Sequence, residues 1–117
     1  MVESQKPQTV IIENFPVTSI NYHGKILFSF SDLGDAFEIN TRDRPFQLQM
    51  KTLERGGKVK SIPIKGMRKN ARMLAFGEFK EIITKAMQDE IREGKYSKED
   101  AEKILVKINK YSQGLPK

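Results

Sequence analysis

The sequence predicts an α+β fold: a helix-turn-helix-like centre with an N-terminal β-hairpin, a basic β-wing and a C-terminal helical pair. Three observations support this prediction. Short segments rich in β-branched and aromatic residues lie before residue 31 and after residue 57. Apolar residues at helical spacing fill the last third of the chain. Between these parts, the segment 42–72 is strongly basic.

Length and composition indicate one soluble domain of 117 residues, with 38% hydrophobic and 31% charged residues. We expect a flexible N-terminus over 1–9, a basic α/β module over 10–76 and a helical pair over 77–113. The absence of cysteine excludes disulfides, thiol nucleophiles and thiolate metal sites. No apolar run is long enough for a membrane span or a signal peptide, so we expect a cytoplasmic protein.

The N-terminal part contains three candidate strands. Val10–Ile12 is a short one, which we expect Pro16 to limit because proline cannot donate to a sheet ladder. Val17–Tyr22 and Lys25–Phe30 follow, with His23-Gly24 between them as a tight hairpin turn. His23 is the only histidine, and without cysteine partners it is interpreted as a turn residue and not as a metal ligand.

A helix of about two turns is predicted over Asp32–Ile39, with Ser31 as its N-cap. Its apolar face comprises Leu33, Ala36 and Phe37. Asn40 suits a left-handed stop, and Gly34 allows a close contact with a neighbouring segment.

The segment Pro45–Leu53 has two interpretations. As part of a helix over Arg44–Glu54, it has one apolar side and one basic side, the latter carrying Arg44, Gln47, Lys51 and Arg55 with Leu48 among them. As a strand, it alternates apolar and polar residues at a period of two. The helix is favoured and the strand stays open, and the basic residues are exposed in both.

A hairpin is predicted after Gly56-Gly57. Lys58–Ile64 is its first strand, and Pro63 indicates a sheet edge. Lys65-Gly66 is a turn signal, and Ala71–Ala75 returns as the partner strand. We expect this hairpin to protrude as a basic wing.

The C-terminal part predicts two helices. The first runs over Glu78–Glu93 and ends at Gly94, and the second begins after the N-cap Ser97. An apolar stripe on the last helix predicts a homodimer contact through Ile104, Leu105, Ile108 and Tyr111. The alternative is that this stripe packs inward.

Nucleic-acid binding is the function that the charge distribution favours. The segment 42–72 has ten Lys or Arg residues and two acidic residues, a net charge of +8, whereas the whole chain has +6. We expect contacts to phosphates of double-stranded DNA from Arg42, Arg44, Lys58, Lys60, Lys65, Arg68, Lys69 and Arg72. Base contacts are expected from Gln47 and Lys51.

Other functions have weaker support. No set of residues has the spacing of a catalytic site, a P-loop or a metal site, so we expect no enzyme activity and no cofactor. The alternative to DNA binding is a protein that inhibits another protein by placing its basic face on an acidic surface.

Several short motifs resemble the N-terminal module of bacteriophage antirepressors, which is similar to the BRO-N domain of viral regulators. They are Tyr22-His23-Gly24-Lys25, Asp32–Ile39, Gln47–Leu53, Ile62-Pro63-Ile64 with Gly66, Arg72-Met73-Leu74 and Glu78-Phe79. The resemblance covers roughly residues 17 to 90. It implies a viral or prophage regulator that binds DNA or a repressor protein. With this resemblance, the alternative function becomes that of a phage protein that inhibits a host protein through its basic face.

Overall fold

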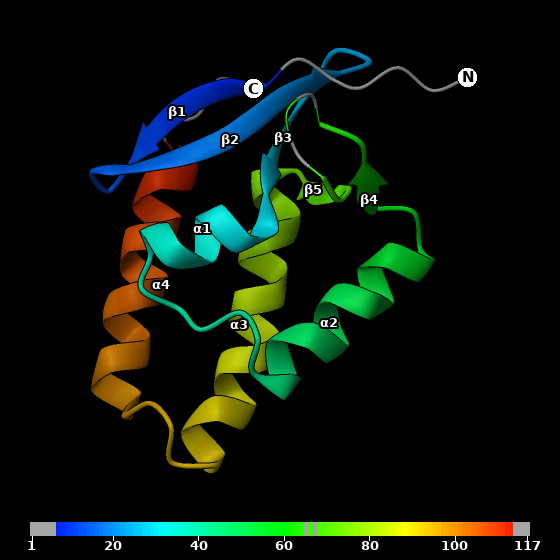
Figure 1. Cartoon of the computed structure of the whole chain (residues 1–117). Helices are drawn as coiled ribbons and strands as arrows, with labels where there is room; N and C mark the ends of the chain where they lie inside the picture. Colours follow the sequence, from blue (N-terminus) through cyan, green and yellow to red (C-terminus); the bar gives the residue numbers. More distant parts are fainter. Residues whose placement is uncertain (1–6, 65, 67, 114–117) are drawn as a thin grey trace.

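The computed structural model describes residues 7–64, 66 and 68–113, which form a five-stranded antiparallel sheet and four helices. The elements are β1 (Gln8–Ile12), β2 (Phe15–Tyr22), β3 (Lys25–Ser29), α1 (Phe30–Ala36), α2 (Arg44–Arg55), β4 (Val59–Ile62), β5 (Ala71–Leu74), α3 (Phe76–Arg92) and α4 (Lys98–Gln113). The sheet order is β1-β2-β3-β5-β4, and the helices gather on one side of it (Figure 1). The predicted α+β class is therefore confirmed.

The N-terminal strands form a meander that begins earlier than predicted. β1 starts at Gln8, so the flexible segment expected over 1–9 is wrong for its last residues, while residues 1–6 lie outside the described part. Pro16 lies within β2 and does not limit a strand. It pairs with Ile11 of β1, whereas β3 pairs with β2 only from Ser19 to Tyr22. No strand pairs with Pro16 on the other side of β2, so the missing N–H of Pro16 removes no hydrogen bond to β3.

Both turns of this meander use positive φ angles. His23 and Gly24 have φ of 51° and 84°, so the predicted hairpin turn is confirmed. The turn between β1 and β2, at Glu13-Asn14, has φ of 51° and 65° and was not predicted from the sequence.

Helix α1 starts and ends before its predicted limits. Its N-cap is Ser29, whose Oγ accepts a hydrogen bond from the Asp32 backbone N at 3.3 Å, so the prediction of Ser31 was wrong. The reason is the burial of Phe30, which turns into the core as soon as β3 ends. At the other end Glu38, with φ of 58°, takes the left-handed conformation expected of Asn40.

Gly34 makes the close contact that the sequence predicted. A Cβ atom at this position would overlap Thr41 Cγ2 and would lie 3.2 Å from the Ile39 carbonyl oxygen. The segment that follows α1 therefore packs directly on the helix backbone, which fixes the path from α1 to α2.

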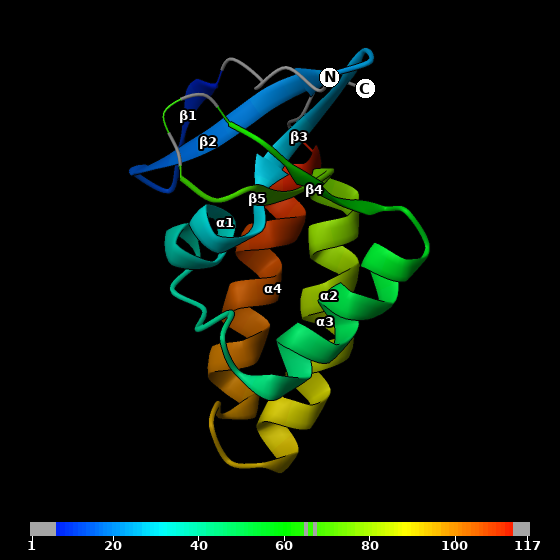
Figure 2. The ribbon, with the colours of Figure 1, turned by 45° about the vertical axis from the view of Figure 1, so that its right-hand side comes forward.

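Residues 44–55 form helix α2, so the strand interpretation of this segment is excluded. Pro45 lies in the first turn, where its missing N–H costs nothing. Phe46 and Met50, one helical turn apart, are fully buried and face α3. The opposite side of α2 faces outward (Figure 2).

The hairpin of β4 and β5 is joined to the sheet and does not protrude freely as predicted. β5 pairs with β4 on one side and with β3 on the other, which leaves β4 at the edge, as Pro63 indicated. Ile62 and Ile64 are buried in a second small core on the sheet face away from the helices, together with Ile20, Leu27, Ala71 and Met73. The burial of Ile62 and Ile64 holds the end of β4 and the residues after it against the sheet.

The C-terminal helices pack against each other, as predicted for the helical pair. α3 starts at Phe76, and Ser97 caps α4 by accepting from the Asp100 backbone N at 3.0 Å. The predicted dimerisation residues contribute to this chain's own core: Ile108 is fully buried, and Ile104, Leu105 and Tyr111 are partly buried against the same cluster. The stripe thus packs inward, as in the alternative stated above.

No helix in the described ranges is long and apolar enough to cross a membrane.

Candidate nucleic-acid interface

The outer face of α2 carries a basic stripe. Arg44, Lys51 and Arg55 are exposed and lie on one helical face with Leu48, which is 50% exposed. Among the described residues, none of the three basic side chains has an ion-pair partner. The stripe stands opposite the buried pair Phe46 and Met50, so its direction is determined by the core.

A polar groove of about 790 Å³ collects four of the other predicted residues. It lies between the start of α1, the α1–α2 connection and β5, and it is lined in part by Arg42, Gln47, Lys69 and Arg72. These four residues come from distant parts of the sequence. The structure therefore divides the predicted basic surface into this groove and the α2 stripe.

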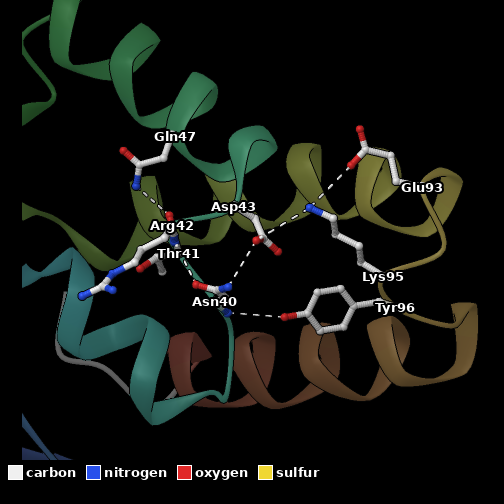
Figure 3. Close-up of polar contacts among 8 residues, drawn as sticks. All are labelled: Asn40, Thr41, Arg42, Asp43, Gln47, Glu93, Lys95 and Tyr96. Atoms are coloured by element: carbon white, nitrogen blue, oxygen red, sulfur yellow. Dashed lines mark hydrogen bonds and ion pairs between the residues drawn. The ribbon is translucent and has the colours of Figure 1, made fainter.

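The wall of the groove that carries Arg42 is held by a network of polar contacts (Figure 3). Asn40 accepts a hydrogen bond from the Arg42 backbone N at 3.2 Å and donates to Asp43 at 3.2 Å. The Asn40 backbone N donates to the Tyr96 hydroxyl at 3.4 Å, and Lys95 Nζ lies 3.7 Å from Asp43. The turn between α3 and α4 thus holds the connection between α1 and α2.

Gln47 has a structural role that the sequence did not reveal. Its Nε2 donates to the Thr41 carbonyl at 2.6 Å, and its Oε1 accepts from Arg72 Nη1 at 3.4 Å. A base contact would have to compete with both hydrogen bonds. Lys51 has no hydrogen-bond partner among the described residues, so a base contact from Lys51, as predicted, would not compete with an internal hydrogen bond.

The remaining predicted residues do not share one face. Strand alternation places Arg72 on the helix side of the sheet and Lys60 on the other side, where its Nζ lies 5.7 Å from the centre of the Tyr22 ring. Lys58 follows α2 and is exposed. Arg68 is exposed in the connection from β4 to β5, and Lys65 lies outside the described residues.

A buried acid beside the α1–α2 connection is the main polar feature that sequence reasoning missed. Glu90 is fully buried, and neither of its carboxyl oxygens has a hydrogen-bond partner among the described residues. Burial, and after it the nearby charge of Asp43, raise its pKa to about 7, although the charge of Lys95 opposes the shift. The spacing of the sequence could have indicated this burial, because Glu90 follows Ile83 and Met87 on the apolar face of α3.

Metal-binding groups do not gather in the described part of the chain: no three His, Cys, Asp or Glu side chains lie where they could hold an ion. Comparisons with protein-family models, curated proteins and solved structures found no match to the chain. The resemblance to phage antirepressors therefore stays a prediction from the sequence.

Proposed function

We propose that the chain is a small duplex-DNA-binding regulator of the phage type, with α2 as the helix that enters the major groove. The observation that carries the proposal is the stripe of Arg44, Lys51 and Arg55, exposed on one face of a helix whose other face is buried. The major groove of B-DNA admits one α-helix, and basic side chains on that helix contact phosphates and base edges.

The order of the elements supports this proposal. β3 is followed by α1 and α2, then by β4 and β5, and β5 returns to pair with β3. A winged helix-turn-helix has the same order, with two helices followed by a hairpin. In that arrangement the second helix lies in the groove and the hairpin touches the backbone. Exposed Arg68, in the connection after β4, would supply a backbone contact.

Salt dependence tests the proposal. Each neutralised phosphate releases counterions, so the logarithm of affinity for a duplex should fall against the logarithm of salt concentration with a slope of about −0.9 per contact. If about five phosphates are contacted, a slope near −4.5 is expected by fluorescence anisotropy. An affinity that stays constant from low to moderate salt would contradict the proposal.

Matched variants locate the surface. Replacing Arg44, Lys51 and Arg55 together by alanine should reduce the slope by about two to three units, because three phosphate contacts are lost. Lys107→Ala on α4, an exposed lysine on a distant helix, serves as the control and should leave the slope unchanged. If only the net charge mattered, Lys107→Ala would reduce the slope by about one third as much as the triple variant.

The second candidate function is binding to an acidic surface of a host or phage protein. Half-exposed Leu48, in the middle of the basic stripe, favours it, because an apolar centre with a charged rim is typical of protein interfaces. A pull-down with and without nuclease separates the two candidates. A stoichiometric protein that survives nuclease supports the protein interface, and DNA that disappears with nuclease supports the first proposal.

A further inference from the structure

We infer that the groove between α1 and β5 binds a phosphate ester of nucleotide size, at a site separate from the α2 stripe. The groove has a volume of about 790 Å³, in the range of small-molecule sites. The inference does not depend on duplex binding.

The charge of the groove lining indicates an anionic ligand. Arg42, Lys69 and Arg72 reach it from three separate segments, and no Asp or Glu is among its described lining residues. Its other polar groups include the hydroxyls of Ser31 and Ser61. Glu54 partly compensates Arg72, which leaves Arg42 and Lys69. A ligand with two negative charges would match these two cations, whereas a single carboxylate would leave one of them uncompensated.

Arg72 is held in one orientation by its neighbours. Its Nε lies 3.6 Å from a Glu54 carboxylate oxygen, and its Nη1 donates to Gln47. No hydrogen bond to a described residue uses its Nη2. A guanidinium fixed in this way can offer its remaining donors to the tetrahedral oxygens of a phosphate, and its planar geometry favours paired contacts.

The backbone that carries Arg42 is held in place as well. Its backbone N donates to Asn40, and the preceding Thr41 carbonyl accepts from Gln47 (Figure 3). Gln47 thus contacts the segments that carry Arg42 and Arg72, and it keeps the two cations on opposite walls. A site built before the ligand arrives loses less entropy on binding.

Phosphate is the group recognised, and it can belong to a free nucleotide or to the end of a nucleic-acid strand. Isothermal titration with adenosine monophosphate and with adenosine tests the phosphate requirement. We expect binding of the monophosphate at least tenfold tighter than that of the nucleoside. Equal affinities would overturn the inference. Titration with a 5′-phosphorylated and a 5′-hydroxyl oligonucleotide identifies the source of the phosphate. If the site binds strand ends, the ratio of these two affinities should exceed the ratio for the monophosphate and the nucleoside. If it binds free nucleotides, the ratio for the oligonucleotides should be the smaller one.

Variants test the location. Arg42→Ala and Lys69→Ala, both exposed, should each weaken binding of the monophosphate about tenfold, and Arg72→Lys should weaken it although the charge is kept. Lys107→Ala, outside the groove, should not change it. Unchanged affinity in Arg42→Ala and Lys69→Ala, both shown to be folded by circular dichroism, would overturn the inference. The variant that lacks Arg44, Lys51 and Arg55 separates the two proposals. It should lose duplex binding and keep monophosphate binding.

Discussion

The buried carboxyl group of Glu90 on α3 lies beside the carboxylate of Asp43, the residue that precedes α2. Lys95 contacts Asp43 from the α3–α4 turn at 3.7 Å, and Glu93 adds a further negative charge nearby. Two acids that share a site of low dielectric constant cannot both ionise without a cost, so Glu90 keeps its proton to about pH 7. This pair lies where the start of α2 meets the helical pair.

Glu90 should make the protein less stable as pH rises. Between about pH 4.5 and 7 the folded state holds a proton on Glu90 that the unfolded state has released, so the free energy of unfolding falls across this window. Above pH 7 the full cost of an ionised, buried Glu90 lowers the stability of the folded state. Glu90→Gln should therefore be more stable than the wild type at pH 8, by roughly 1–3 kcal/mol, with a much smaller difference at pH 4.

Urea denaturation at both pH values measures this effect. Glu102→Gln, on the exposed side of α4, is the control and should change stability little at either pH. A Glu90→Gln variant with the pH dependence of the wild type would contradict the assignment.

Gly34→Ala should destabilise the fold by about 1–3 kcal/mol, because the added methyl group would overlap Thr41. Gly77→Ala is a close control: Gly77 also lies in a helix, and nothing is within 4 Å of its Cβ position. We expect the control to be neutral or slightly stabilising, since alanine favours helices. Thermal unfolding followed by circular dichroism compares the two, and equal behaviour would argue against the close contact.

Gln47→Ala should lower the free energy of unfolding by about 1–2 kcal/mol, because the Thr41 carbonyl loses its hydrogen-bond donor. Gln49→Ala, in the same helix and without a side-chain hydrogen bond to a described residue, should have less effect. If Gln47 acts through structure, its loss should weaken binding to unrelated duplexes by the same factor. A loss confined to one duplex sequence would instead assign Gln47 to base recognition.

Ile108→Asp should unfold the chain, since Ile108 is completely buried between α4 and the core. Val106→Asp, at a position 64% exposed on the same helix, should leave the fold intact. Circular dichroism checks both expectations. The predicted homodimer is then tested by sedimentation equilibrium on the wild type and Val106→Asp, and a monomer mass for the wild type at tens of micromolar would exclude it.

Local chemistry predicted much of this fold. The spacing of Phe46 and Met50, the glycine after His23 and the serine before α4 each act within a few residues, and the structure confirms the helix, turn and cap that they indicated. The sequence also places a net charge of +8 in the segment 42–72, and the exposure of the described basic side chains follows from the cost of burying a charge.

Contacts between distant residues determined the rest. Sheet pairing placed Lys60 and Arg72 on opposite faces, and the burial of Ile64 bound the expected wing to the sheet. Arg42, Lys69 and Arg72 became neighbours only because β5 lies next to β3. A sequence pattern reports periodicity within one element, whereas a groove depends on which elements meet, and that choice is made by the packing of the whole core.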